Sequence, residues 1–289
     1  MRELTRYIDM IEHGLEKYLK AEGCPQKVVY EAMKYSVDAG GKRLRPVLCL
    51  AACEAFGGKV EEAVAFACAI EMIHTYSLIH DDLPCMDDDD LRRGRPTNHK
   101  VFGEATAVLA GDALLTYAFE VAASCGLPAK QRVEAVRQMA RWSGPDGMIG
   151  GQIVDMLAEE QEITEEQLYF LHEHKTSALI CESLLLGLIA ADADEAAKQA
   201  MTEYGRYLGL AFQIRDDMLD VIGESAELGK PVGSDSDNTK TTFVTMFGLE
   251  RSSELVREYT EKAVEAVRRA CASPGFFVDF ANDLVNRKK

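Results

Sequence analysis

Apolar residues recur with a helical period along most of the chain. In residues 1–20 they stand three to four positions apart, at Leu4, Ile8, Ile11, Leu15 and Leu19. This is the spacing of one buried helix face. The sequence Gly-Cys-Pro at 23–25 ends the pattern, because glycine and proline both break helices. The chain therefore opens with an amphipathic helix.

The same pattern continues between clear breaks. It predicts further helices over 26–37, from Pro46, over 62–83, from Gly150–Gln152, through 184–189, over 250–271 and over 275–287. Turns are predicted over 122–130 and 144–147, and a long polar loop over 223–240. We find no strand alternation, linker or repeat, so the sequence predicts an all-α, single-domain protein over residues 1–289.

Composition supports a large core and limits the partners. Hydrophobic residues make up 47% of the 289 residues, and there are only 8 prolines. The formal net charge of −16 argues against a nucleic-acid partner, which needs a basic surface. The same charge repels an anionic substrate unless cations screen its site, so bound metal is expected.

Targeting signals and disulfide patterns are absent from the sequence. The N-terminal residues carry no apolar leader, and the richest apolar run, Ser177–Ala191, contains Glu182. No stable membrane insertion is therefore expected. The 8 cysteines include no Cys-x-x-Cys pair, and Cys49 and Cys53 lie one helical turn apart. We interpret the cysteines as reduced, buried thiols of a cytoplasmic protein.

The stretch richest in chemistry follows the apolar helix over 62–83. Six carboxylates fall within residues 81–90. Pro84 disfavours helix at the residue before it, which places Asp81 and Asp82 in the last helical turn and Asp87 in the returning loop. The carboxyl end of a helix favours cations, and hard oxygen ligands suit magnesium. The alternative is a solvated acidic loop.

Basic residues follow this run and also occur earlier in the chain. Arg92, Arg93 and Arg95 come directly after the carboxylates, and guanidinium groups bind phosphate in a bidentate manner. Gly40 and Gly41 precede three cations, Lys42, Arg43 and Arg45, at a predicted helix start. That arrangement is an anion site on physical grounds, although basic loops are common. Carboxylates for a metal beside arginines for a phosphate indicate a metal-bridged diphosphate site.

A second acidic stretch ends another apolar helical pattern. Asp216 and Asp220 stand four positions apart, which puts them on one helix face about 5–6 Å apart. Two such sites brought face to face would hold several magnesium ions around one diphosphate.

Three motifs resemble those of the trans-isoprenyl diphosphate synthases. Asp81–Thr97 resembles their first aspartate-rich motif, Phe212–Asp220 their second, and Gly40–Pro46 their N-terminal substrate-binding signature. The motifs stand in the family order and the resemblance covers nearly the whole chain. It is closest to the bacterial farnesyl diphosphate synthases. It implies a bundle of about ten helices around a deep apolar cavity, a homodimer and small-molecule diphosphate substrates.

The resemblance also assigns roles to individual residues. It implies three magnesium ions per site, for which manganese can substitute. Their ligands would be Asp81, Asp82, Asp87, Asp216 and Asp220. Isopentenyl diphosphate would be held by Lys42, Arg45, His74 and Arg93. The allylic diphosphate would be held by Arg92, Lys175, Thr176, Lys230 and Lys240, with Gln213 beside the reacting carbon. On the residues alone, His74 is as readily a core histidine.

The implied reaction is head-to-tail prenyl transfer that ends at farnesyl diphosphate. The resemblance makes Tyr76 the floor of the tail pocket. Helix geometry instead places Ser77 one turn from Asp81, on the same face, which makes it the other chain-length candidate. Tyr76 as an ordinary core residue remains an alternative. A geranylgeranyl diphosphate synthase is the nearest rival. A class I terpene cyclase and a non-catalytic subunit are more distant ones, since both aspartate motifs are intact.

Overall fold

The structure, a computed structural model, describes residues 2–20, 23–228 and 241–286, and most of them are helical. The predicted all-α class is therefore confirmed. The chain forms two compact units, Met1–Met139 with Leu185–Asp192 and Ala140–Leu184 with Ala193–Lys289. The single domain over residues 1–289 stays a prediction.

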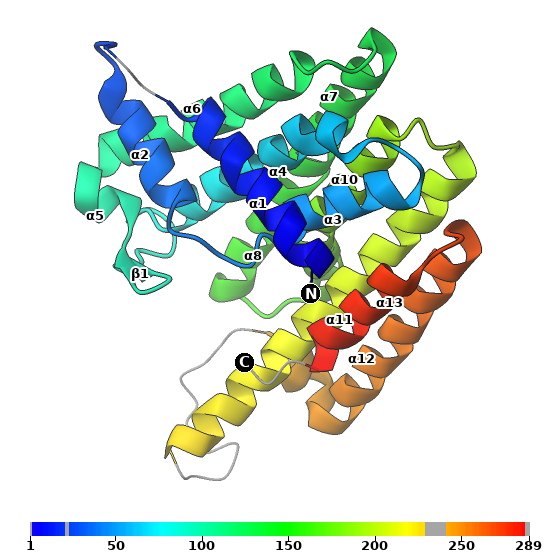
Figure 1. Ribbon diagram of the computed structural model, residues 1–289. Coiled ribbons are helices and arrows are strands. Elements are labelled where there is room, and N and C mark those ends of the chain that lie inside the picture. Colours follow the sequence, from blue (N-terminus) through cyan, green and yellow to red (C-terminus); the bar gives the residue numbers. More distant parts are fainter. Residues whose placement is uncertain (1, 21–22, 229–240, 287–289) are drawn as a thin grey trace. The chain divides into compact units, whose positions relative to one another are not determined.

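The first unit is organised around one buried helix (Figure 1). Its elements are α1 (Arg2–Tyr18), α2 (Lys27–Val37), α3 (Leu44–Ala55), α4 (Val60–Asp81), β1 (Leu91–Arg92), β2 (Arg95–Pro96), α5 (Asn98–Phe102), α6 (Glu104–Ala123), most of α7 (Ala129–Ser143) and the end of α10 (Ala178–Ala190). Helices α1, α3 and α6 pack against α4. Helix α4 is apolar on several sides, and Phe66, Ile70 and Ile73 are fully buried, as expected of a helix covered all round.

The second unit is built on the longest helix. It contains α8 (Met148–Glu160), α9 (Glu165–His172), a π-helical turn η1 (Glu173–Ser177), the start of α10, α11 (Glu195–Leu228), α12 (Phe243–Ala270) and α13 (Gly275–Asn286). Figure 1 shows α12 and α13 running beside α11. Their core includes Leu168, Ile214 and Phe243, none of which is exposed.

Several helix boundaries in the structure differ from those predicted from the sequence. Helix α4 ends at Asp81 with Asp82 as its C-cap, as Pro84 indicated. The loop expected from Gly223 is wrong at its start, because α11 continues to Leu228; Lys230 and Lys240 lie outside the described residues. Helix α12 begins at Phe243 and contains a non-helical Gly248. The predicted start at 250 therefore marks the helical stretch after this kink.

A short hairpin was not expected from the sequence. Strands β1 and β2 pair antiparallel, with Arg92 opposite Arg95. The two turn residues between them, Arg93 and Gly94, have φ of 55° and 74°. Two consecutive positive φ values characterise the tight turns that join hairpin strands. Arginine is an unusual residue for the first of these positions, which is why the pattern was missed.

The cysteines are only partly as predicted. All 8 are free, and Cys49, Cys53, Cys68, Cys181 and Cys271 are buried. Burial raises the pKa of Cys53, Cys68 and Cys181 to about 12, so these thiols stay protonated at neutral pH. The prediction that every cysteine is buried is wrong for Cys85, which is exposed in the acidic loop.

Two helices, α4 and α6, are long and apolar enough to cross a membrane by length and composition alone. In α4, 72% of the most apolar 18-residue window is buried, and in α6 39%. The apolar run singled out in the sequence, Ser177–Ala191, is not one of them. Such helices are weak evidence for a membrane protein, because a buried core helix passes the same test.

Glycines allow the closest helix contacts. A Cβ at Gly111 of α6 would lie 2.1 Å from Nε2 of His80 on α4, so this glycine lets the two helices approach closely. Gly205 and Gly209 of α11 lie in the same way against Cys181 and Ser177. In the first unit, a Cβ at Gly187 would lie 2.2 Å from the carbonyl oxygen of Cys49. Here the obstacle is backbone, so α3 and α10 cannot adjust by a side-chain rotation.

We therefore predict that Gly187→Ala destabilises the protein. In an open helix this change gains about 1 kcal/mol from helix propensity, but overpacking costs about 1–3 kcal/mol. The free energy of unfolding, measured by urea denaturation, should fall by up to about 2 kcal/mol, the overpacking cost less the propensity gain. Gly126→Ala is the control, because no atom lies within 4 Å of its added Cβ. A Gly187→Ala protein as stable as the wild type would contradict the packing argument.

Candidate active site

The acidic loop folds back onto the end of α4. The backbone N–H of Asp87 donates to the carbonyl oxygen of Asp81 at 2.9 Å, and that of Asp88 donates to Leu83 at 3.2 Å. This return brings the backbone of Asp87 beside the helix end, as the sequence indicated. Asp81 is half-buried and Asp87 is exposed. Two carboxylates from positions six apart thus share the carboxyl end of one helix.

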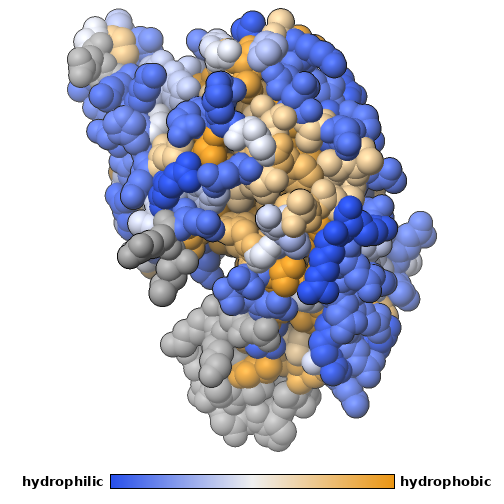
Figure 2. Space-filling model, turned by 45° about the vertical axis from the view of Figure 1, so that its right-hand side comes forward, coloured by the Kyte–Doolittle hydropathy of each residue, from blue (hydrophilic) through white to orange (hydrophobic). Residues whose placement is uncertain are grey.

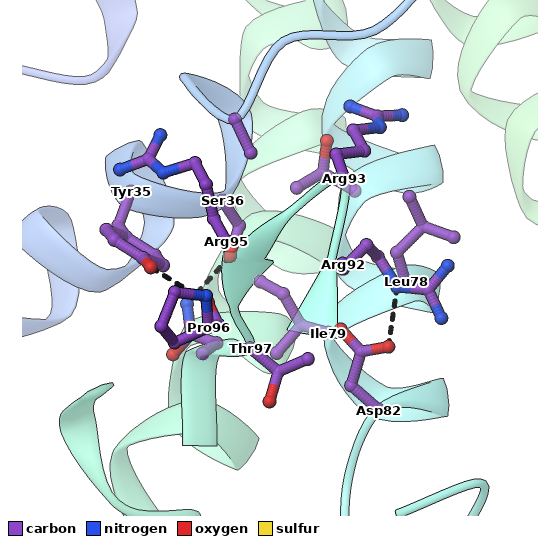
Figure 3. Close-up of a pocket in the computed structure, with 13 residues that line it drawn as sticks. Tyr35, Ser36, Leu78, Ile79, Asp82, Arg92, Arg93, Arg95, Pro96 and Thr97 are labelled. Atoms are coloured by element: carbon purple, nitrogen blue, oxygen red, sulfur yellow. Dashed lines mark hydrogen bonds and ion pairs between the residues drawn. The ribbon is translucent and has the colours of Figure 1, made fainter. Parts of the chain in front are cut away.

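Other carboxylates of the run pair with basic residues. Asp82 is 3% exposed and accepts from Nε of Arg92 at 2.5 Å, a contact that Figure 3 shows. Asp89 accepts from Nη2 of the same arginine at 3.3 Å, and Asp90 pairs with Lys100 at 2.6 Å. Burial raises the pKa of Asp82, and Arg92 opposes that shift. Asp82 therefore orients Arg92 at the base of the hairpin.

The glycine pair and its cations divide into two roles. Arg43 is 3% exposed, and its guanidinium pairs with Glu71 at 2.6 Å and with Glu12 at 2.8 Å. It also donates to the carbonyl oxygen of Val37 at 2.7 Å. The inclusion of Arg43 among the anion-binding cations is therefore wrong. Its charge is used inside the first unit, whereas its neighbour Lys42 is exposed.

Several predicted ligands meet around His74 of α4. Nη1 of Arg45 lies 3.4 Å from Nε2 of His74. A Cβ at Gly41 would lie 2.6 Å from the guanidinium carbon of Arg93, so this arginine lies over the glycine loop. Burial, followed by the charges of Arg45, Arg93, Arg92 and Arg43, holds the pKa of His74 well below its ordinary value. The imidazole is therefore neutral at pH 7, and Nε2 accepts from Arg45.

Figure 3 shows how the hairpin presents its arginines. Arg92 turns toward Asp82, while Arg93 extends from the turn. The cavity beside them has a volume of about 30 Å³, which is room for a water molecule rather than a substrate. Tyr35 closes it on the other side and donates to the carbonyl oxygen of Pro96 at 2.8 Å. Arg95 lies over the Tyr35 ring, 4.5 Å from its centroid.

The two candidate chain-length residues face different neighbours. Tyr76 is 5% exposed, and its ring meets that of His80 edge to face at 5.7 Å. His80 lies against Gly111 of α6, so Tyr76 belongs to the side of α4 that packs on α6. Ser77 donates to the carbonyl oxygen of His74 at 2.9 Å and is half-buried.

In the second unit, the π-helical turn carries Lys175 and Thr176. Thr176 donates to the amide oxygen of Gln213 at 3.1 Å, and the amide nitrogen of Gln213 donates to Asp217 at 3.2 Å. Asp217 also accepts from the backbone N–H of Phe243 at 2.9 Å. This chain fixes which end of the Gln213 amide faces Thr176. The π turn and the part played by Asp217 were not predicted; the Lys-Thr-Ser sequence alone does not indicate either.

Lys175 forms an ion pair with Asp155 of α8. Asp155 is 7% exposed, and the Nζ–Oδ2 contact is also a hydrogen bond. The sequence identified Lys175 and gave no reason to single out Asp155. A π-helical turn at a predicted ligand is consistent with a functional site, because such turns often occur there.

The second aspartate pair lies within α11, as predicted. Asp216 and Asp220 are one turn apart on this helix. Asp216 is half-buried and Asp220 exposed, whereas Asp217 between them is buried. The helix thus presents two carboxylates on its accessible side and uses the third to hold the start of α12.

The donor set fits magnesium. Within the described ranges no three His, Cys, Asp or Glu side chains are gathered closely enough to hold a metal ion on their own. Magnesium does not require such a cage, since it keeps several waters and binds through one or two carboxylates plus substrate phosphates. Asp81 and Asp87 in the first unit, and Asp216 and Asp220 in the second, are donors of that kind.

Comparisons with known proteins agree with these features. Residues 26–273 match the model of the polyprenyl synthetase family. A farnesyl diphosphate synthase from Geobacillus stearothermophilus is 45% identical over 90% of this chain and 88% of its own. A geranylgeranyl diphosphate synthase from Cyanophora paradoxa is 47% identical over 96% and 93%. The apo crystal structure of an FPP/GFPP synthase from Zymomonas mobilis superposes with a TM-score of 0.88, at 36% identity over 98% of each chain.

These matches confirm the resemblance seen in the three motifs. The family match spans most of the chain, and the relatives are similar along nearly their whole length. Prenyl synthases of this family depend on magnesium in general. The chain therefore belongs to the polyprenyl synthetase family, and its activity is that of a prenyltransferase.

Proposed function

We propose that this protein condenses isopentenyl diphosphate with dimethylallyl and geranyl diphosphates to give farnesyl diphosphate. The observation that carries the proposal is that each unit carries carboxylate donors and groups suited to a diphosphate or a cation on the same elements. The first unit offers Asp81 and Asp87 at the end of α4, where Asp82 holds Arg92. The second offers Asp216 and Asp220 on the helix that bears Gln213. Farnesyl diphosphate as product is supported by the aromatic residue at Tyr76.

The basic residues divide between two diphosphates in this proposal. Lys42, Arg45, His74 and Arg93 hold isopentenyl diphosphate. Arg92, Lys175 and Thr176 hold the allylic diphosphate, together with Lys230 and Lys240 from outside the described residues. Magnesium, three ions per site, would be held by Asp81, Asp82, Asp87, Asp216 and Asp220, and Asp82 also orients Arg92. Bound magnesium supplies positive charge that neutralises the allylic diphosphate as it leaves.

The reaction breaks the allylic carbon–oxygen bond, and its electron pair leaves with the diphosphate. The amide oxygen of Gln213, oriented by Thr176 and Asp217, and a carbonyl near Thr176 face the allylic cation. Fixed dipoles of this kind stabilise developing charge without reorganising. The double bond of isopentenyl diphosphate then forms the new carbon–carbon bond. A proton is lost to the departed diphosphate, which restores the double bond.

A deep apolar cavity that excludes water is part of the proposal, because water would quench the cation. A geranylgeranyl product is the main alternative, since relatives of both kinds match at similar identity. A terpene cyclase or a non-catalytic subunit is less consistent with two complete aspartate sites.

We also propose a cytoplasmic homodimer without a nucleic-acid partner. Among the described residues, Val108 and Leu109 on α6 are 40% and 55% exposed. Figure 2 shows apolar surface gathered beside strongly hydrophilic areas on one face of the molecule. Exposed apolar side chains that lie together are typical of interaction sites, and a second copy of the chain would cover those of α6.

The first prediction from this proposal concerns the metal. Excess chelator should abolish turnover, and added magnesium should restore it. Asp81→Asn and Asp216→Asn should each lower kcat by roughly a hundredfold or more, about 2.7 kcal/mol of transition-state stabilisation. Their free energies of unfolding should change little, because like charges repel without metal. Asp279→Asn, an exposed aspartate on α13, is the control. Full activity in excess chelator would contradict the proposal.

The second prediction separates the two diphosphates. Lys42→Ala should raise KM for isopentenyl diphosphate roughly tenfold or more, the expected loss of one charge-assisted hydrogen bond. Lys175→Ala should act mainly on the allylic substrate. Steady-state kinetics with each substrate varied in turn measures both effects. Lys59→Ala removes a lysine whose side chain is 78% exposed and should change neither. Equal effects of Lys42→Ala and Lys175→Ala on both substrates would indicate one shared anion site.

The third prediction concerns product length. Chromatography of the dephosphorylated alcohols should give farnesol for the wild type and added geranylgeraniol for Tyr76→Ala. Tyr76→Phe keeps the ring and should keep the wild-type product. Because removing a buried aromatic ring costs about 3–5 kcal/mol, the folded fraction of Tyr76→Ala is measured alongside. A wild type that already makes mainly the twenty-carbon product would show that Tyr76 is not the floor.

A further inference from the structure

The π-helical turn η1 is held between two glycines of the second unit. A Cβ at Gly151 of α8 would lie 2.2 Å from the backbone nitrogen of Lys175. A Cβ at Gly209 of α11 would lie 2.3 Å from Oγ of Ser177 and 2.7 Å from its Cα. Both neighbouring helices therefore approach the turn to backbone contact. The position of Lys175 is set by these two contacts rather than by the turn alone.

Asp155 follows Gly151 by four residues and so lies on the same face of α8. That face is the one in contact with the π turn, and there Asp155 meets Nζ of Lys175. The Asp155 side chain is 10% exposed and that of Lys175 is 30% exposed. A carboxylate this buried requires a charged or hydrogen-bonding partner. In return, the ion pair restricts a long side chain that otherwise samples many rotamers.

A carboxylate on the π turn itself makes a useful contrast with Asp155 of α8. Glu173 pairs with Arg206 of α11, with 2.7 Å between Oε1 and Nε. The Arg206 side chain is 55% exposed, so this pair lies at the surface. The turn thus carries one surface ion pair and one largely buried ion pair. Only the buried pair includes a residue assigned to the diphosphate.

We propose that Asp155 is a positioning residue for Lys175. It holds the ammonium group at the place where the leaving diphosphate oxygens gather charge, and it acts only through that lysine. The inference rests on the proposed function, which assigns Lys175 to the allylic diphosphate. Asp155→Asn keeps the charge of Lys175 but removes the carboxylate that fixes its position. We therefore expect kcat to fall by a larger factor than KM for the allylic substrate rises. Loss of the lysine itself should lower kcat at least as far and should also weaken allylic binding.

A double-mutant cycle tests this, with Asp155→Asn, Lys175→Ala and the double variant assayed on geranyl diphosphate. Asp155→Asn should lower kcat/KM for geranyl diphosphate roughly tenfold or more, as expected for a misplaced catalytic group. KM for isopentenyl diphosphate should stay unchanged. In the Lys175→Ala background the same substitution should change kcat/KM less than about twofold, because the two residues act as one unit.

Two further variants and two measurements keep the outcome clear. Glu173→Gln makes the same carboxylate-to-amide change on the π turn that carries Lys175 and should leave kcat unchanged. Asp155→Glu keeps the charge and should recover part of the loss; if Asp155→Asn does not fold, the cycle is run with Asp155→Glu. Circular dichroism and thermal unfolding report the folded state.

Two results would overturn the positioning role alone. One is an equal loss from Asp155→Asn with and without Lys175, which would make Asp155 a structural residue. The other is a shift in the magnesium concentration that activity requires when Asp155→Asn is added to Lys175→Ala. That shift would make Asp155 a metal ligand. If Lys175→Ala itself leaves the geranyl diphosphate kinetics unchanged, the assignment of Lys175 fails first and the positioning role fails with it.

Discussion

Each unit holds a candidate diphosphate-binding cation on a buried carboxylate. Arg92 lies on Asp82 in one unit, and Lys175 lies on Asp155 in the other. A buried carboxylate costs free energy unless it is paired, so each aspartate depends on its cation. The cation in turn loses the rotamer freedom that a long basic side chain otherwise keeps. Within its own unit each pair joins two elements, the arginine hairpin to the end of α4 and the π turn to α8.

Arg43 shows that a buried ion pair does not by itself indicate a binding site. Its guanidinium donates to Glu71, Glu12 and Val37, which leaves little capacity for a ligand. Arg92 and Lys175 have one or two partners and are about one-third exposed, at 31% and 30%. The number of partners and the exposure of the side chain separate a structural cation from a candidate ligand.

Much of the fold was predictable because its signals are local. Pro84 and the glycine pair at 40–41 mark helix ends whatever the rest of the chain does, and the 3–4-residue spacing marks the buried faces. The return of Asp87 to the end of α4 followed from the same break. The candidate aspartates and basic residues were recognisable from their chemistry and from the family motifs.

The remaining features depend on contacts that are remote in sequence. The burial of Arg43 requires Glu12 and Glu71, which stand far from it along the chain. The π turn at Lys175 is stabilised by Gly151 and Gly209 on two other helices. Nothing in a basic tripeptide reveals such neighbours. The hairpin was missed for a different reason, since Arg93 takes a left-handed conformation that usually belongs to glycine or asparagine.

The neutral state of His74 connects these observations. A protonated imidazole would add another positive charge beside Arg45, Arg92 and Arg93, and burial together with those charges opposes it. An arginine can only donate, so the contact with Nε2 requires that nitrogen to accept and leaves the proton on Nδ1. His74 then orients Arg45 through Nε2. Asp82 orients Arg92 in the same way, and Asp155 orients Lys175. Each carboxylate accepts a hydrogen bond from a basic side chain that is assigned to a diphosphate. In each case the hydrogen-bond acceptor is at least half-buried, so it holds the basic side chain in one position.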